Sequence, residues 1–141
     1  MVERIWVYSV FSDITKEFKL SESGLATTFD VIHSEEVFEH LTEEEVVTTL
    51  RNIKSLMKDE SILLLGISLH DDCREIRGGK SVNLHKTVRT GLWWESALVN
   101  NGFELMPTII VDKNVYGWPF ATSNRSNFSD SVFFGVKKAS C

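Results

Sequence analysis

The sequence has little of what marks secreted or membrane proteins. Only two cysteines occur among 141 residues, too few for a disulfide framework. No apolar run reaches the roughly 20 residues of a membrane-spanning helix, and the first segment, MVERIWVYSVF, has no small-residue cleavage site of a signal peptide. These absences predict a cytoplasmic protein that does not bind membranes.

Positive charge is also scarce. Twenty acidic residues stand against 15 basic ones, which gives a net charge of −5 at pH 7. Non-specific binding to nucleic acid depends on a basic surface, so we expect no nucleic-acid partner. The composition, 43% hydrophobic and 25% charged, is typical of a soluble globular chain. The length predicts a single domain over residues 1–141.

The hydrophobic pattern alternates between strands and helices. Thr42 and Glu45 have the spacing of a capping box and predict a helix that ends before the turn Lys58-Asp59-Glu60. A second helix is predicted for residues 90–101, and residues 70–89 are interpreted as a long loop. The predicted strands are residues 5–11, 28–33, 61–69, 103–111 and 131–136.

Strands separated by helices predict a mostly parallel α/β sheet, and the last two strands, with no helix between them, can pair antiparallel. Ligands of open sheets bind beyond the carboxyl ends of the strands. Polar or acidic side chains follow three predicted strands, at residues 11–13, 33–36 and 69–72. The binding site is therefore predicted at this edge of the sheet.

Several segments resemble, in the correct order, class I S-adenosylmethionine-dependent methyltransferases. FDVIHSEEVFEHL is similar to the fourth strand of that family and its following turn, and LRNIKSLMKDESILLLGIS to the next helix and fifth strand. VRTGLWWESALVNNGFEL resembles the late helix before the sixth strand, and SVFFGVKK the antiparallel last strand. VYSVFSDITKEF resembles the third strand. The resemblance implies the family's Rossmann-like sheet, mostly parallel with an antiparallel last strand, and S-adenosylmethionine as cofactor.

Glycine is missing where that family needs it. A Gly-rich turn after the family's first strand lets the backbone approach the methionine part of the cofactor, and an acidic residue after the second strand holds the ribose. The eight glycines here lie outside such a strand-turn-helix pattern, and nothing before Ile5 is expected to supply it. The resemblance thus implies a truncated fold, the C-terminal half of a methyltransferase without much of its cofactor site.

Two functions remain open at this point. The first is methyl transfer to a small-molecule or saccharide-type acceptor by an incomplete transferase. The second is a non-catalytic remnant that acts as an oligomerisation or partner-binding module, since a sheet without its first strands exposes an edge. A homodimer or a complementing chain is the expected partner in either case.

The resemblance also implies site residues. Asp13, Ser34 and Glu35 are implied to bind the cofactor, although an aspartate after a strand also suits a turn or cap. His33 and Glu36 are candidates for the base that accepts a proton from the acceptor. His40 is a third candidate, with packing beside the Thr42 cap as the alternative.

The segment after the fifth strand raises the question of zinc, because it contains His70, Cys73 and His85. A structural zinc site needs four ligands with paired spacing, so no metal site is predicted there. Trp93 and Trp94 are neighbours on a predicted helix, and one of them is expected to face outward. The aromatic segment NVYGWPF, residues 114–120, is interpreted as a lid or a partner surface.

Overall fold

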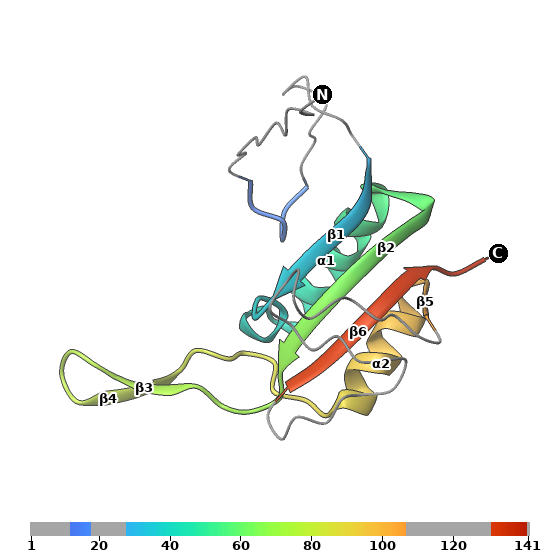
Figure 1. The fold of residues 1–141 in the computed structure, drawn as a ribbon. Coiled ribbons are helices and arrows are strands. Elements are labelled where there is room, and N and C mark those ends of the chain that lie inside the picture. The colour runs from blue at the N-terminus through green and yellow to red at the C-terminus, as the bar shows by residue number, and fades with distance from the viewer. Residues whose placement is uncertain (1–11, 18–27, 107–130, 141) are drawn as a thin grey trace, which may run out of the picture.

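A computed structural model of the chain describes residues 12–17, 28–106 and 131–140. They form a four-stranded sheet of order β1-β2-β6-β5 and a separate two-stranded sheet, β3-β4 (Figure 1). The predicted strand at residues 5–11 and the aromatic segment 114–120 lie outside the described residues. The elements are β1 (Phe29–Glu35), η2 (Phe38–His40), α1 (Glu43–Ser55), β2 (Met57–Ser68), β3 (Cys73–Ile76), β4 (Lys80–Asn83), α2 (Gly91–Asn100), β5 (Phe103–Leu105) and β6 (Ser131–Lys138).

Three of the four strands in the main sheet run in one direction. β1 is parallel to β2, β6 is antiparallel to β2, and β5 is antiparallel to β6. The pairing of β1 with β2 is parallel because α1 carries the chain back to the start of the sheet between them. The predicted α/β sheet, mostly parallel with an antiparallel last strand, is confirmed.

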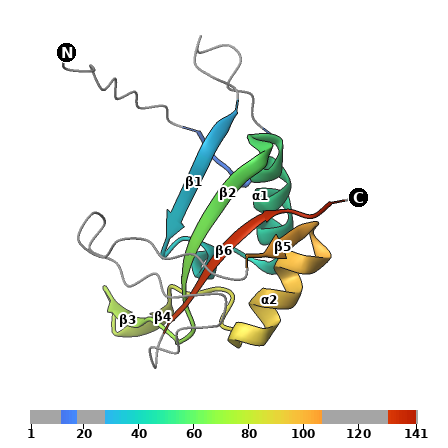
Figure 2. The same ribbon diagram turned by 45° about the vertical axis from the view of Figure 1, so that its right-hand side comes forward.

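The core lies on the face of the sheet that both helices cover (Figures 1 and 2). The central strands pair in register, so that Leu63 lies opposite Val136 and Leu65 opposite Phe134. All four side chains are at most 5% exposed. The helices add the buried residues Val46, Leu50 and Ile53 from α1 and Trp94 and Leu98 from α2.

None of the helices in the described part of the chain has the length and apolarity needed to cross a membrane.

Helix α1 begins at the predicted capping box. The Thr42 hydroxyl accepts a hydrogen bond from the Glu45 amide at 3.2 Å, and the Glu45 carboxylate accepts one from the Thr42 amide at 2.8 Å. The bond from the Thr42 amide lowers the pKa of Glu45, because it favours the charged carboxylate. Both orphan donors at the start of the helix are thereby satisfied.

Replacing Thr42 by alanine is expected to lower the free energy of unfolding by about 1 kcal/mol, while Thr42→Ser, which keeps the hydroxyl, should stay close to the wild type. The folded pKa of Glu45 lies below its ordinary value of 4.5. The carboxylate's contribution is therefore present above that pH and lost as the pH falls through the folded pKa. Urea denaturation at neutral and acidic pH tests both points. An identical acid dependence in Glu45→Gln would contradict the second.

The predicted turn Lys58-Asp59-Glu60 is wrong, because these residues belong to β2, which begins at Met57. The Ser61 hydroxyl accepts a hydrogen bond from the Lys58 amide at 2.8 Å and donates one to the Phe29 carbonyl at 2.5 Å. Residues 58–60 keep their side chains in water. Charged residues thus extend the strand in a pattern that resembles a turn.

The interpretation of residues 70–89 as a long loop is also wrong in part. β3 and β4 form an antiparallel hairpin whose residues are all exposed, and it projects away from the main sheet (Figure 1). Gly78 and Gly79 adopt φ values of 97° and 72° at its turn, which glycine adopts without strain. A hairpin with both faces in water lacks the alternating apolar pattern that predicts a strand.

Candidate functional site

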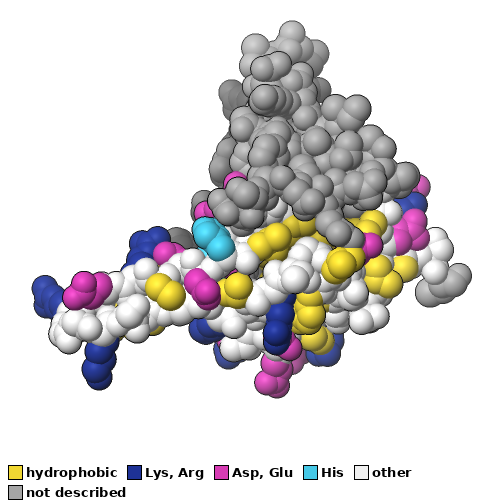
Figure 3. Space-filling view, turned by 90° about the horizontal axis from the view of Figure 1, so that it is seen from below, with side chains coloured by type: hydrophobic (Ala, Val, Ile, Leu, Met, Phe, Trp, Pro, Cys, Tyr) yellow, Lys and Arg dark blue, Asp and Glu magenta, His cyan; other side chains and the backbone are white. Residues whose placement is uncertain are grey.

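The carboxyl ends of β1 and β2 meet at one edge of the sheet, where the sequence predicts a ligand. Glu35 lies opposite Gly66, and the Glu36 amide donates a hydrogen bond to the Gly66 carbonyl at 2.9 Å. Ser34, Glu35 and Glu36 are therefore brought together at this edge. Figure 3 views the molecule from this end, where a histidine side chain reaches the surface close to acidic side chains.

Glu36 has an unusual backbone conformation. Its φ is 50°, and it is the one non-glycine residue with a positive φ in the three described ranges. This left-handed conformation is unfavourable for a glutamate by about 1–3 kcal/mol, and such strain gathers at functional sites. Next to it, desolvation and the charge of Glu36 raise the pKa of Glu35. The structure thus places backbone strain and two carboxylates at the predicted edge.

Glu36→Gly is expected to raise the free energy of unfolding by about 1 kcal/mol, because glycine adopts a positive φ without strain. Glu35→Gly, the matched control one residue earlier in β1, should instead destabilise the chain. Urea denaturation of the two variants and the wild type measures the difference. A Glu36→Gly variant less stable than the wild type would show that the side chain holds the loop.

His33 is exposed on β1 and lies on the same side of the strand as Val31 and Glu35. Asp13 lies elsewhere, in a turn beside α1. Its carboxylate accepts hydrogen bonds from the Thr15 amide at 3.0 Å and the Thr15 hydroxyl at 2.6 Å, and the hydroxyl bond is the main cause of its lowered pKa. Asn52 of α1 donates to two backbone carbonyls of this turn. These contacts tie Asp13 to its own turn and that turn to helix α1, not to the end of β1.

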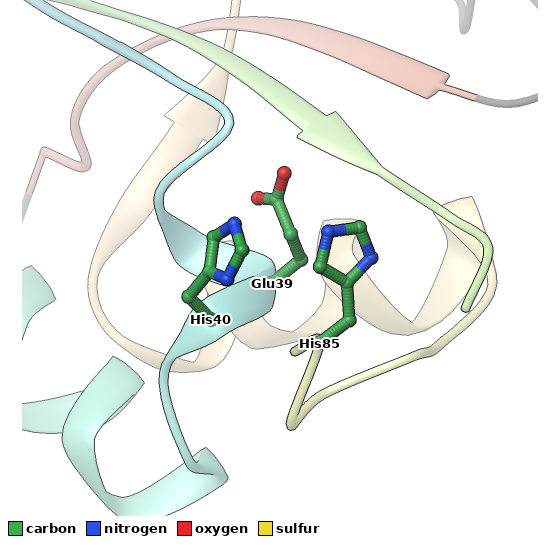
Figure 4. Close-up of side chains that lie close together, drawn as sticks. All are labelled: Glu39, His40 and His85. Carbon is green, nitrogen blue, oxygen red and sulfur yellow. The ribbon is translucent and has the colours of Figure 1, made fainter. Parts of the chain in front are cut away.

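A cluster that the sequence analysis missed lies beside this edge. Glu39, His40 and His85 bring one ligand atom each within 4.8 Å of one another, and their side chains converge in Figure 4. Glu39 is 0% exposed and His85 is 8% exposed. Burial is the main cause that raises the pKa of Glu39, and the backbone amides of Glu39 and Ser68 offset it in part. Two imidazoles thus face a carboxylate that is buried from water.

Backbone hydrogen bonds orient both imidazoles. His40 Nδ1 donates to the Leu84 carbonyl at 3.0 Å, and His85 Nδ1 donates to the His70 carbonyl at 2.6 Å. A carbonyl only accepts, so Nδ1 carries a proton in each ring, and the neutral form of each ring is the tautomer with its lone pair on Nε2. The two rings meet edge to face with their centroids 4.7 Å apart. The free nitrogens are therefore fixed in tautomer and direction.

The segment that carries His85 is fastened to η2 by its backbone. The amides of Lys86 and Thr87 donate to the Glu39 carbonyl at 2.8 and 3.0 Å, and the Thr87 hydroxyl donates to the Leu41 carbonyl at 2.6 Å. These hydrogen bonds join segments that are far apart in sequence, and no spacing of residues along the chain predicts them. The Glu39-His40 pair was the only signal in the sequence, and it did not reveal which histidine would join it.

The residues first considered for zinc do not form one ligand set, although the His70 and His85 rings meet edge-on with centroids 5.9 Å apart. Cys73 lies in the exposed hairpin, and Asp72 forms an ion pair with Arg74 at 3.0 Å. His70 Nδ1 lies 2.5 Å from the Ser68 hydroxyl. Of that group only His85 contributes to the cluster with Glu39 and His40.

An open cavity of about 590 Å³ follows the end of β2 and is lined by Leu69, Val88, Arg89, Thr90, Gly91 and Trp93. The Arg89 guanidinium lies 5.6 Å from the centre of the Trp93 ring, and it forms an ion pair with Glu43. Trp94 is 1% exposed and belongs to the core. Trp93 is half-buried and packs against the core from the cavity side, so the prediction that one of the two tryptophans faces outward is met only in part.

No protein-family model matches the sequence, and no curated protein is similar to it. Solved structures are similar in fold. An S-adenosylmethionine-dependent methyltransferase from Clostridium acetobutylicum superimposes with a TM-score of 0.61 at 9% identity, over 93% of this chain and 64% of its own. A TehB-like methyltransferase from Corynebacterium glutamicum gives 0.57 at 16% identity, over 92% of this chain and 55% of its own. The fold is that of class I S-adenosylmethionine-dependent methyltransferases.

A third methyltransferase of this fold carries ligands. The 1,6-didemethyltoxoflavin-N1-methyltransferase from Burkholderia thailandensis, solved with its substrate and S-adenosylhomocysteine, gives a TM-score of 0.56 at 10% identity, over 93% of this chain and 50% of its own. The chain thus spans about half to two thirds of the length of these methyltransferases. Identities this low show the fold alone, because one fold hosts many functions.

Two carboxylates among the described residues are opposite in charge to the cationic groups of the methyltransferase cofactor. S-adenosylmethionine carries a cationic sulfonium and an amino group, and Glu35 and Glu36 place two carboxylates at the end of β1. The described glycines with positive φ lie elsewhere, in the β3-β4 turn and, as Gly102, after α2. A Gly-rich strand-turn-helix is therefore absent from the described part of this methyltransferase fold.

Proposed function

We propose that the chain takes part in methyl transfer from S-adenosylmethionine to a small-molecule or saccharide-type acceptor. The proposal treats residues 1–141 as one methyltransferase-like domain, with the rest of the cofactor site supplied by elements outside the described residues. The observation that carries it is the methyltransferase fold with strained, acidic residues at the carboxyl end of β1. Ligands of open α/β sheets bind at this edge.

Ser34 and Glu35 are the residues proposed to face the cofactor, which when bound supplies an electrophilic methyl group. Asp13, the third residue implied by resemblance, has recorded contacts that favour a turn role instead. Glu36 is the base that we favour, because its carboxylate is exposed on a fixed strand end. His33 is the alternative base. His40 directs its free nitrogen into the buried cluster, which favours a role there over proton transfer to an acceptor.

The cavity beside Trp93 is the proposed acceptor pocket. Its volume of about 590 Å³ falls within the range of small-molecule sites. The indole ring offers a face for stacking an aromatic ring or a sugar. Leu69 joins the cavity to the end of β2, directly after Ser68. Positioning of the acceptor is thus proposed as the main contribution of this part of the chain.

The first test is calorimetric titration with S-adenosylmethionine and S-adenosylhomocysteine. Saturable binding is expected, and Glu35→Gln should weaken it, whereas Glu60→Gln, an exposed acid of β2, should leave it unchanged. Absence of binding at millimolar ligand, with and without candidate complementing chains, would overturn the proposal. Once an acceptor is found, Glu36→Gln should lower kcat by about 10²–10⁴-fold if Glu36 is the base.

Partner binding without catalysis is the second candidate function. β1 is the terminal strand of the described sheet, and Val31 on it is 56% exposed. Exposed strands at sheet edges recruit other strands. Sedimentation velocity at high protein concentration tests this candidate, and a clean monomer would count against a homodimer through this strand.

A further inference from the structure

We infer that Glu39, His40 and His85 form a binding site for one divalent transition-metal ion. The cluster lies where η2 and the segment after β4 meet, close to the end of β2 (Figure 4). The inference concerns metal binding alone, so it holds or fails independently of methyl transfer.

The donor set is one that such ions prefer. Imidazole nitrogen suits zinc, iron, cobalt and nickel, and a carboxylate oxygen suits manganese as well. Three protein ligands of this kind are typical of sites that keep a coordination position open for water or substrate, since structural zinc sites are closed by four. A set of two histidines and one glutamate therefore indicates a metal site with an open coordination position, not a structural metal site.

The ring orientation is that of metal-binding histidines. Such residues usually donate their second N–H to a carbonyl or carboxylate, which fixes the tautomer and leaves the other nitrogen for the ion. His40 and His85 both do so, through Nδ1 to the Leu84 and His70 carbonyls. Each histidine thus has its Nδ1 held by a carbonyl, which leaves Nε2 as the nitrogen available to an ion.

Glu39 supplies the independent observation. Its side chain is 0% exposed, and neither carboxylate oxygen has a partner with hydrogen-bond geometry among the described residues. The backbone amides of Glu39 and Ser68 come close enough to lower its pKa in part, but they do not complete a hydrogen bond. A buried charged group without a partner is strongly destabilising, so buried carboxylates are normally paired or coordinate a metal. An ion between Glu39 and the two Nε2 atoms would satisfy this carboxylate.

The distances require a small adjustment. Two ligands on opposite sides of an ion lie at most about 4.2 Å apart, from bonds of about 2.1 Å. The ligand atoms of the cluster lie within 4.8 Å of one another. A small rotation of the Glu39 carboxylate or of one ring, which moves its ligand atom by a fraction of an ångström, would bring the atoms to the distances that an ion requires. The backbone that carries the three residues is held by the hydrogen bonds of Lys86 and Thr87 to Glu39.

The position suggests what the ion would do, and this last step rests on the proposed function. Ser68, at the end of β2, precedes Leu69 of the acceptor pocket and lies close enough for its amide to act on Glu39. An ion with an open position binds an acceptor oxygen and lowers its pKa. The site would then orient and activate an oxygen nucleophile.

The test uses the whole chain, freed of metal with a chelator. Co²⁺ is titrated while the visible absorption bands of the coordinated ion are followed, and Zn²⁺ is titrated by calorimetry. One ion per chain is expected. His85→Ala and the nearly isosteric Glu39→Gln should each weaken metal binding. Loss of a partner that only orients a ligand weakens binding about 10–100-fold, and loss of a ligand itself should weaken it by at least as much. His70→Ala is the matched control for a histidine beside the cluster that is not a ligand. Its ring contacts Ser68 and meets the His85 ring edge-on, and the variant retains the backbone carbonyl that orients His85.

Folding of each variant is checked by circular dichroism, and Zn²⁺ should raise the Tm of the wild type and of His70→Ala only. If His85→Ala fails to fold, Glu39→Gln decides alone. Absence of saturable Co²⁺ binding at millimolar concentration, or equal binding by the wild type and Glu39→Gln, would overturn the inference. Titration of the same samples with S-adenosylmethionine separates a failure here from a failure of the proposed function.

Discussion

Replacing Trp94 by alanine is expected to lower the free energy of unfolding by about 3–5 kcal/mol. Its side chain is 1% exposed and lies in the core between α2 and the sheet. It meets the Phe38 ring edge-on, with centroids 6.4 Å apart and planes at 83°, so it joins α2 to η2. Alanine would leave a cavity that the surrounding strands cannot fill, and the cluster around Glu39 would lose its support.

The matched control for this change is Leu92→Ala, two residues earlier in the same helix. Leu92 is 56% exposed, so its truncation should change the free energy of unfolding by no more than about 0.5 kcal/mol. Urea denaturation followed by far-ultraviolet circular dichroism suits both variants, since it does not depend on tryptophan fluorescence. A loss below about 1 kcal/mol for Trp94→Ala would mean that α2 is not anchored through this ring.

Replacing Glu39 by methionine is expected to raise the stability of the metal-free chain by about 1–3 kcal/mol, the penalty of an unsatisfied buried polar group. Methionine has a similar length and no branch, so it fills the same space without a charge. Neither oxygen of Glu39 has a partner with hydrogen-bond geometry in the described residues, although two backbone amides lie near, and its exposure is 0%. A buried carboxylate of this kind is typical of a site where stability is lower in favour of function.

Urea denaturation with and without Zn²⁺ completes this second experiment. The wild type should gain stability from the ion, and Glu39→Met should gain none. Glu60→Met, at an exposed position of β2, is the control and should stay within about 0.5 kcal/mol of the wild type. If metal-free Glu39→Met is less stable than the wild type, the carboxylate is satisfied by neighbours and the argument for an ion loses its main support.

Local signals in the sequence were dependable where a few neighbouring residues decide the structure. The capping box at Thr42 and Glu45 forms as predicted, because both hydrogen bonds stay within one helical turn. The same reasoning misread Lys58-Asp59-Glu60, because Ser61 bonds to the neighbouring strand through the Phe29 carbonyl. A contact between strands overrode the local preference for a turn.

The residues of the candidate site also fall into those that the sequence predicted and those that it did not. The polar end of β1, with Ser34, Glu35 and Glu36, followed from the position of a strand end in an α/β sheet. The strain at Glu36 did not, because glutamate has no local preference for a positive φ. In the fold, the Glu36 amide bonds to the Gly66 carbonyl of β2 at this point. Asp13 was grouped with these residues by resemblance, and its contacts in the fold are with Thr15 instead.

Within the described residues, the sequence by itself determined the order of the two α-helices and of the strands in the main sheet, the resemblance to methyltransferases and the polar residues at the carboxyl end of β1. Each of these depends on residues close together in the chain. Only the tertiary structure decided that His85 joins Glu39 and His40. That meeting depends on the amides of Lys86 and Thr87 bonding to the Glu39 carbonyl across the fold. Hydrogen bonds between distant segments leave no periodicity in the sequence, so the cluster becomes visible only once the chain has folded.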